Sequence, residues 1–239
     1  MITAKYGRTY HYPFSPGTSS DDRIQYDYWQ HIQGMSTLLH TEKLDGENNC
    51  LNRYGVFARS HAAPTTSPWT AALRQRWESL KHDLGDLELF GENLYAVHSI
   101  EYYRLEQHYF VFAVRCLDMW LSWEEVQFYA AAFDFPTVPL LAQTSDFQNE
   151  ATFKATVLSL AAQRSGFDSH DVQSGKSCTR EGIVSRNSDA FPVAALGENV
   201  FKYVRKGHVK TDAHWTRHWK RARLIHEQKP GSHGTNSFE

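Results

Sequence analysis

The stretch Thr41-Glu42-Lys43-Leu44-Asp45-Gly46-Glu47-Asn48 decides how the chain is interpreted. It closes one apolar run, MSTLLHTEK (35–43), and leads into another, NCLNRYGVFARS (49–60), so we expect strand, tight turn, strand. The Asp-Gly pair favours a turn and places the amine of Lys43 at its lip. Such an amine becomes a nucleophile if burial or nearby cations lower its pKa. The alternative is an exposed hairpin with a solvated lysine.

Further motifs follow in a fixed order. They are ARS (58–60), FGENLY (90–95), the aromatic run YFVF (109–112), EGIVSR (181–186) and VFKYVRK (200–206). The ordered series resembles the covalent nucleotidyltransferase superfamily, which contains the ATP-dependent ligases and the mRNA capping enzymes. Within it, the chain looks most like the RNA ligase 2-like branch of ATP-dependent RNA ligases. The motifs cover most of residues 41–206.

The resemblance implies a role for each matching residue. Lys43 matches the lysine that attacks the α-phosphate of ATP and becomes lysyl-AMP, and Lys202 matches a lysine that contacts this phosphate. Asp45 joins these two as a candidate catalytic residue. Transfer of a nucleotidyl group depends on neutralising oxygens that gain charge, which fits cations at these positions.

Other matching residues are expected to surround the nucleotide. Glu92 would hold the ribose, Phe112 would stack on the adenine, and Arg59 would contact the ribose or the phosphate under attack. Glu181 would help to place Mg²⁺ or Mn²⁺, since hard cations prefer carboxylate oxygens. The full predicted nucleotide-binding set is Glu42, Lys43, Asn48, Arg59, Glu92, Phe112, Glu181 and Lys202.

Two positions depart from the family pattern. In this family an acidic residue often follows the aromatic residue of the middle strand, but here that position is Ala113. The role of the acid is therefore either absent or taken by another residue, for which Asp118 is a candidate. The last motif often carries a second lysine two residues on, but here that residue is Val204, with Arg205 and Lys206 beside it.

The net charge of −2 conceals an uneven distribution. Residues 78–125 carry ten acids and three bases, whereas residues 200–225 carry eight bases and one acid. A basic segment is either a solvated helix face or a surface that contacts phosphates. The predicted nucleic-acid contacts are Arg205, Lys206, Lys210, Arg217, Lys220 and Arg221.

Irregular alternation of helices and strands favours an α+β fold. The resemblance implies a nucleotidyltransferase (ATP-grasp-like) domain of two antiparallel sheets flanked by helices. We expect helices over 68–84, 123–133, 149–164 and 212–226, and strands over 87–97, 108–117, 181–186 and 199–205. Ser122 and Glu125 match a capping box.

The expected domain spans residues 1–228, with an irregular N-terminal arm and a basic C-terminal helix, followed by a flexible tail over 229–239. Ser15-Pro16-Gly17 in the arm is either a plain turn or, with Arg8, part of a cover over the nucleotide or the RNA end.

The predicted function is an ATP-dependent RNA ligase that seals 5′-phosphate and 3′-hydroxyl ends. The alternatives are a DNA ligase or capping-type enzyme, and a non-catalytic RNA-end-binding module on the same fold. The 33 residues after Lys206 are too few for the extra domain that DNA ligases and capping enzymes usually append. No apolar segment approaches the ~20 residues of a membrane span. Three widely spaced cysteines favour a cytoplasmic location.

Overall fold

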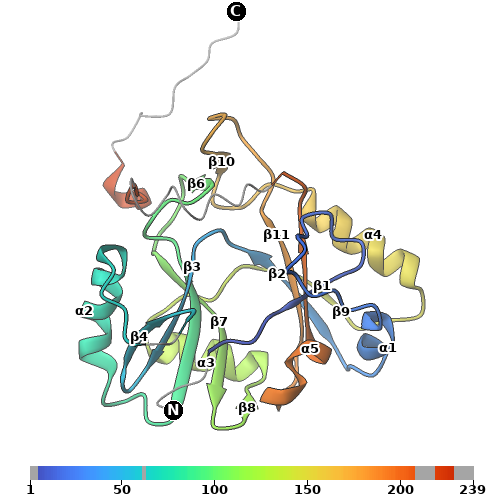
Figure 1. Cartoon of the computed structure of the whole chain (residues 1–239), viewed down its shortest axis with the longest axis horizontal. Helices are drawn as coiled ribbons and strands as arrows, with labels where there is room; N and C mark the ends of the chain where they lie inside the picture. Colours follow the sequence, from blue (N-terminus) through green and yellow to red (C-terminus); the bar gives the residue numbers. More distant parts are fainter. Residues whose placement is uncertain (1–4, 61–62, 208–218, 229–239) are drawn as a thin grey trace, which may run out of the picture.

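A computed structural model describes residues 5–60, 63–207 and 219–228 of the chain. Two β-sheets face each other, and helices cover their outer sides (Figure 1). Both sheets are antiparallel except for the parallel pairing of the short first strand with the last. This confirms the predicted α+β class and its two flanked sheets. Among the described residues, no helix has both the length and the hydropathy needed to cross a membrane.

The five-stranded sheet carries both candidate lysines. In spatial order its strands are β1 (Tyr10–His11), β13 (Val200–Val204), β11 (Gly182–Asn187), β2 (Leu38–Lys43) and β9 (Leu140–Thr144). Its outer face is covered by helices α1 (Tyr28–Gln33) and α4 (Glu150–Ala161). Because side chains alternate along a strand, Leu38 and Phe201 pack under these helices, while Lys43 and Lys202 point to the facing sheet.

The six-stranded sheet forms the opposite wall. Its strands are, in spatial order, β12 (Phe191–Pro192), β8 (Met119–Trp120), β7 (Tyr109–Cys116), β5 (Leu87–Asn93), β3 (Glu47–Asn52) and β4 (Gly55–Ala58). The main apolar core lies between this sheet and helices α2 (Ala71–Leu80) and α3 (Trp123–Ala132). A small sheet pairs β6 (Ile100–Tyr102) with β10 (Ser169–Asp171), and the short helix α5 (Leu196–Asn199) leads into β13.

The segment 44–46 joins the two sheets. The predicted strand, turn and strand are present, but β2 and β3 do not pair with each other. Instead β2 pairs with β11 and β9, and β3 pairs with β4 and β5. The hairpin reading is therefore wrong for this turn, because the chain crosses from one wall to the other immediately after Lys43.

The predicted helices are confirmed except for the last. A complete capping box of Ser122 and Glu125 starts α3. Pro68–Thr70 form a 3₁₀ turn before α2. The helix expected over 212–226 is wrong for the described part: 219–224 is extended, and only Ile225–Glu227 form a 3₁₀ turn.

The reason lies in where the backbone of this segment finds its hydrogen-bond partners. Val97 N donates to Lys220 O at 2.8 Å, Ala222 N donates to Tyr95 O at 2.8 Å, and Ile225 N donates to Leu105 O at 2.7 Å. These bonds to loops of the six-stranded sheet replace those within a helix. The remaining part of that prediction, 212–218, and the predicted tail over 229–239 lie outside the described residues.

Candidate nucleotide-binding site

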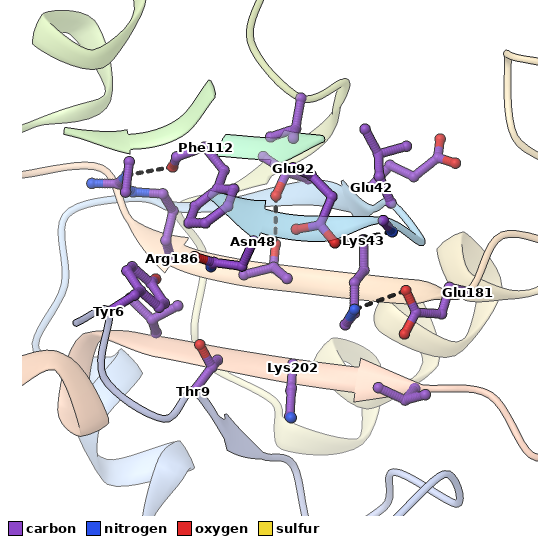
Figure 2. Close-up of a pocket in the computed structure, with 18 of the residues that line it drawn as sticks. Tyr6, Thr9, Glu42, Lys43, Asn48, Glu92, Phe112, Glu181, Arg186 and Lys202 are labelled. Carbon is purple, nitrogen blue, oxygen red and sulfur yellow. Dashed lines mark hydrogen bonds and ion pairs between the residues drawn. The ribbon is translucent and has the colours of Figure 1, made fainter. Parts of the chain in front are cut away.

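A cavity of about 510 Å³ opens between the two facing sheets. Side chains from both walls and from the N-terminal arm project toward it (Figure 2). Every residue predicted for catalysis or nucleotide binding contributes to the lining of this cavity, Glu42 through its backbone, although these residues lie up to 160 positions apart in the chain. The cavity is lined by Glu42, Lys43, Asp45, Asn48, Arg59, Glu92, Phe112, Glu181 and Lys202.

Lys43 and Glu181 form an ion pair at the centre of the cavity. Lys43 ends β2, and the register of β2 with β11 sets Gly182 opposite it, so that Glu181 lies beside the amine. Lys43 Nζ donates to Glu181 Oε2 at 2.7 Å, as Figure 2 shows. A Cβ on Gly182 would lie 1.9 Å from Tyr203 O, so only glycine lets β11 and β13 approach so closely.

The neighbouring carboxylates keep the amine of Lys43 charged. Burial by itself would lower the pKa of Lys43, but the charges of Glu181, Glu92 and Asp45 outweigh it and raise this pKa above its usual range. The activating cation expected from the sequence is therefore not the dominant neighbour. Lys43 must lose its proton, and its ion pair with Glu181, before the nitrogen can attack.

The turn after Lys43 is held by its own side chains. Asp45 Oδ2 accepts hydrogen bonds from Ser99 N at 2.9 Å, Ser99 Oγ at 2.7 Å and Ile100 N at 2.8 Å. Gly46 N donates to Glu92 Oε1 at 3.0 Å. A Cβ on Gly46 would lie 2.6 Å from Asn93 O. Through these hydrogen bonds Asp45 holds the turn that follows Lys43, so its contacts in this structure are those of a residue that positions Lys43.

Glu92 and Asn48 lie side by side on the six-stranded sheet, paired across β3 and β5. Burial raises the pKa of Glu92 to about 7, with the nearby Glu181 adding to the rise and Lys43 opposing it. Asn48 Oδ1 is buried with no hydrogen-bond partner among the described residues. A buried acceptor without a donor costs free energy, so this atom fits a ligand that supplies a hydroxyl or amino hydrogen.

One part of the cavity lining is aromatic. Phe112 of β7 is half-buried and meets the ring of Tyr6 edge-on, with ring centroids 5.2 Å apart. Arg186 is buried behind it and donates to Phe112 O at 3.2 Å. An aromatic ring that lines a cavity beside polar acceptors is a surface on which a nucleobase can stack.

Lys202 and Arg59 supply positive charge to the cavity. Burial and the charges of Lys43 and Arg59 together lower the pKa of Lys202 to about 8, against the opposing charges of Asp22 and Glu181. Arg59 is exposed and follows β4. Three cations, Lys43, Lys202 and Arg59, therefore line the cavity, an arrangement suited to a polyphosphate.

Glu42 borders the cavity, but its side chain leaves β2 on the side opposite Lys43 (Figure 2). Both of its carboxylate oxygens are buried without a hydrogen bond among the described residues. Burial raises the pKa of Glu42, and the charge of Arg180 opposes the rise. Glu42 therefore borders the cavity through its backbone, and its side chain points away from Lys43.

Several predicted residues lie elsewhere. Asp118 is exposed in the turn between β7 and β8 and does not line the cavity, so it does not replace the acid missing at Ala113. Arg205 and Lys206 also lie outside the cavity lining, so the second lysine missing at Val204 has no substitute from them.

Part of the predicted nucleic-acid surface is charge-paired. Lys220 Nζ lies 2.5 Å from Glu101 Oε1, and Arg221 binds Glu227 through two hydrogen bonds of 2.7 and 2.6 Å. These bonds lower the pKa of Glu227 to about 2. The other two predicted contacts in this stretch, Lys210 and Arg217, lie outside the described residues.

The sequence patterns missed the contribution of the arm. Tyr6, Thr9, His11 and Asp22 all line the cavity, although the arm was expected to be irregular. Only β1, two residues long, is regular there. The sequence left open whether Ser15-Pro16-Gly17 is a plain turn or, with Arg8, part of a cover. Neither Arg8 nor Ser15 lines the cavity, and the arm instead adds strand β1 to the five-stranded sheet.

The carboxylates at the centre can contribute to a metal site but do not complete one. No cluster of three or more metal-ligating side chains occurs among the described residues. Glu181, nearly buried and facing the cavity, supplies hard oxygen ligands. Mg²⁺ is commonly bound by one or two carboxylates together with waters and substrate phosphates, so the donor set fits a divalent cation that arrives with a nucleotide.

Comparison with known families gives a clear match. A family model described as RNA ligase matches residues 36–204, well over half of the chain. No protein of curated function matches the chain by sequence.

Solved structures with this fold include several of a Naegleria gruberi RNA ligase. A mutant form of it with ATP and Mn aligns with a TM-score of 0.53 and 20% identity over 82% of this chain and 58% of that chain. The same ligase with PPi aligns with a TM-score of 0.51 and 19% identity over 91% and 63% of the two chains. Another mutant form, with AMP and Mn, has a TM-score of 0.51, 19% identity and coverage of 87% and 62%. The chain thus spans about three-fifths of the length of these relatives and shares their fold.

Proposed function

Because the chain belongs to the RNA ligase family, we propose that it is an ATP-dependent RNA ligase that acts through a lysyl-AMP intermediate. The observation that carries this proposal is the position of Lys43. Its amine lies at the centre of a cavity with Lys202 on the same wall and Glu92 and Phe112 on the other. The complexes of the Naegleria ligase with ATP and Mn and with AMP and Mn support the same ligands for this cavity.

In the first step, Lys43 Nζ attacks the α-phosphorus of ATP. A P–N bond forms, the bond to the bridging oxygen of pyrophosphate breaks, and pyrophosphate leaves with the electron pair. Lys43 first loses a proton, and Glu181 Oε2 at 2.7 Å is within reach of it. Lys202 and Arg59 neutralise the phosphate oxygens that gain charge. A divalent cation held by Glu181 and the phosphates would add Lewis-acid stabilisation.

The six-stranded wall binds the nucleoside in this proposal. Phe112 stacks on the adenine, and the carboxylate of Glu92 accepts hydrogen bonds from the ribose hydroxyls. The unpartnered Asn48 Oδ1 accepts a further hydrogen from the nucleoside. Positioning of this kind converts the attack into an intramolecular step, which is where most of the rate enhancement for such transfers originates.

The next two steps seal the RNA. A 5′-phosphate oxygen of the RNA attacks the phosphorus of lysyl-AMP, the P–N bond breaks, and a 5′–5′ pyrophosphate forms. A 3′-hydroxyl then attacks the RNA phosphorus of this linkage, and AMP leaves. Covalent activation divides one difficult displacement into steps with good leaving groups.

The direct test is incubation of the protein with α-labelled ATP and a divalent cation. We expect label on the protein that is released by acid and is lost in Lys43→Ala. Lys81→Ala is the matched control, since Lys81 pairs with Glu78 of α2, outside the cavity. No label on the wild-type protein, or label that persists in Lys43→Ala, would refute the proposal.

Substrate choice distinguishes the remaining functions. A ligase should join RNA strands with 5′-phosphate and 3′-hydroxyl ends and release AMP. Label from GTP in place of ATP would indicate capping chemistry, and exclusive joining of DNA strands would indicate a DNA ligase. Binding of RNA ends without any covalent label would indicate a non-catalytic module.

A further inference from the structure

The N-terminal arm is part of the wall that carries Lys202. β1 runs parallel to β13, with His11 directly opposite Lys202 in the register. Tyr12 N donates to Lys202 O at 2.9 Å, and Gly17 N donates to Val204 O at 3.0 Å. The arm is therefore an additional strand of the catalytic sheet and fixes its residues relative to β13.

Asp22 follows this strand and faces Lys202. Asp22 Oδ1 lies 3.7 Å from Lys202 Nζ and 3.3 Å from His11 Nε2. The other oxygen, Asp22 Oδ2, accepts from Ser19 N at 2.9 Å and from Ser19 Oγ at 2.8 Å. Asp22 and Lys202 both line the cavity, and each side chain is 20% exposed. The carboxylate is thus held in one orientation at the edge of the site.

His11 connects Asp22 back to β13. Its side chain is only 2% exposed, and its Nδ1 lies 2.9 Å from Ser15 Oγ. Ser15 Oγ in turn accepts a hydrogen bond from Val204 N at 2.9 Å. The contacts form a closed circuit that begins at Val204 and ends at Lys202, two residues apart on the same strand. The links of Ser15 to Val204 and to His11 are buried hydrogen bonds, which hold the imidazole in place beside the carboxylate of Asp22.

The charges around Lys202 show why this carboxylate matters. Lys43 on β2 and Arg59 after β4 repel the ammonium, and burial also disfavours it. Two carboxylates oppose these effects, Glu181 and Asp22. Glu181 binds Lys43 at 2.7 Å, whereas Asp22 Oδ1 lies 3.7 Å from Lys202 Nζ and is the carboxylate that forms an ion pair with it.

We propose that Asp22 is a positioning residue that keeps the Lys202 ammonium charged and directed at the nucleotide phosphates, and that His11 and Ser15 hold Asp22 in place for this purpose. The inference rests on the proposed function, because it assigns the arm a part in the formation of lysyl-AMP. It predicts that the arm acts through the charge of Lys202 and without contact with the reacting atoms.

The test is the pH dependence of kcat/KM for ATP in self-adenylylation, which reports groups of the free enzyme. In the wild type, kcat/KM should rise with pH as Lys43 loses its proton and should level off near pH 8, where Lys202 loses its charge. In Asp22→Asn the levelling should begin about one pH unit lower, since one opposite charge shifts a pKa by roughly 1–3 units. Activity should match the wild type at low pH and be about tenfold lower above pH 8.

Three further variants separate positioning from simple structural damage. Asp21→Asn removes the same charge from the exposed neighbouring residue and should leave the profile unchanged. His11→Ala should move the levelling in the same direction as Asp22→Asn. In a Lys202→Arg background the Asp22→Asn substitution should produce no further shift, because arginine stays charged throughout this range.

The outcomes distinguish the two proposals. Absence of label on the wild-type protein would refute the proposed function itself. A wild type that labels, combined with an Asp22→Asn variant that loses activity equally at every pH, would overturn the positioning role alone. If Asp22→Asn fails to fold, as judged by thermal unfolding, His11→Ala decides the question: a profile that levels at the wild-type pH would overturn the positioning role.

Discussion

The two walls of the cavity carry different chemistry. The five-stranded sheet presents charged groups that contact one another: Lys43, Glu181 and, through the arm, Asp22 with Lys202. The six-stranded sheet presents an aromatic face at Phe112 and a buried acceptor at Asn48. Under the proposed function, the first wall would bind the phosphates and the second would bind the nucleoside, with Arg59 after β4 adding one cation from the second wall. If this division is correct, substitutions on the first wall should slow chemistry, and substitutions on the second should weaken binding.

The turn at 44–46 is what makes this division possible. It crosses from β2 to β3, so a single short segment places Lys43 on the phosphate wall and Asn48 on the nucleoside wall. Asp45 anchors the turn to the backbone at Ser99 and Ile100. The two walls are therefore coupled through the most compact motif of the chain.

The largest effect is expected on the phosphate wall, at Lys202. Lys202→Ala should lower the rate constant for lysyl-AMP formation by about 10²–10³-fold, the usual cost of removing one group that stabilises developing charge. The KM for ATP should change much less. Single-turnover labelling measures both quantities, and Lys202→Arg should recover part of the rate. A large rise in KM with an unchanged rate constant would contradict the assignment of this wall.

The next effect is expected on the nucleoside wall, at Phe112. Phe112→Ala should raise the KM for ATP with little change in the rate constant, because stacking contributes about 1–3 kcal/mol per base, roughly a 5- to 150-fold change. Phe112→Tyr should retain the stacking face and the affinity. Phe128→Ala, at a 65% exposed position on α3, is the control for removal of an aromatic ring. A collapse of the rate constant at saturating ATP would show that the walls are not separable.

The sequence predicted the residues of the two walls better than those of the N-terminal arm. The order of the motifs predicted nine of the residues that line the cavity. Asp45, Glu92 and Glu181 each lie beside a glycine of their motif, whereas Phe112 and Lys202 lie in the middle of strands and were assigned only through the resemblance to a known family. Runs of aromatic and β-branched residues predicted most of the strands. The arm was not predicted, since Tyr6, His11 and Asp22 lie in an irregular, Pro- and Gly-containing segment whose partner strand is about 190 residues away.

Other misses have similar physical causes. β9 follows two prolines and is largely exposed, so it lacks the buried alternation that marks a strand. The segment 219–224 continues the helical spacing of Trp215 and Trp219, yet its backbone bonds to the loops at Tyr95 and Val97. Long-range backbone pairing overrides a local helical pattern here, and no periodicity within the segment reports it.

The third prediction concerns the pH dependence that Glu92 imposes. Its carboxylate must be ionised to accept hydrogen bonds from the ribose, and burial raises its pKa to about 7. As the pH falls below 7, Glu92 becomes protonated and the neutral fraction of Lys43 decreases. Each effect lowers kcat/KM for ATP by up to about tenfold per pH unit, so together they approach a hundredfold per unit. Glu92→Gln cannot be protonated in this range, so its profile should fall only about tenfold per unit.

The measurement is self-adenylylation at low ATP concentration between pH 5.5 and 7, roughly the range in which a group with a pKa near 7 titrates. Glu101→Gln is a suitable control, because Glu101 pairs with Lys220 outside the cavity. An unchanged slope in Glu92→Gln would show that ionisation of Glu92 does not govern nucleotide binding.

The smallest effect is expected outside both walls, on the segment 219–228. Lys220 and Arg221 are each paired with a carboxylate, Glu101 and Glu227, so little of their charge is left for RNA phosphates. Replacing both with glutamine should leave self-adenylylation intact and weaken strand sealing by only about twofold to fivefold, within the ~1 kcal/mol typical of exposed charges. Added salt should erase that difference, since phosphate contacts weaken as counterions compete. Lys176→Gln, at an exposed site beyond β10, is the matched control. A loss of sealing above about a hundredfold, far beyond what exposed charges contribute, would mean that RNA displaces Glu101 and Glu227 from their partners, and the segment would then be a third functional surface beside the two walls.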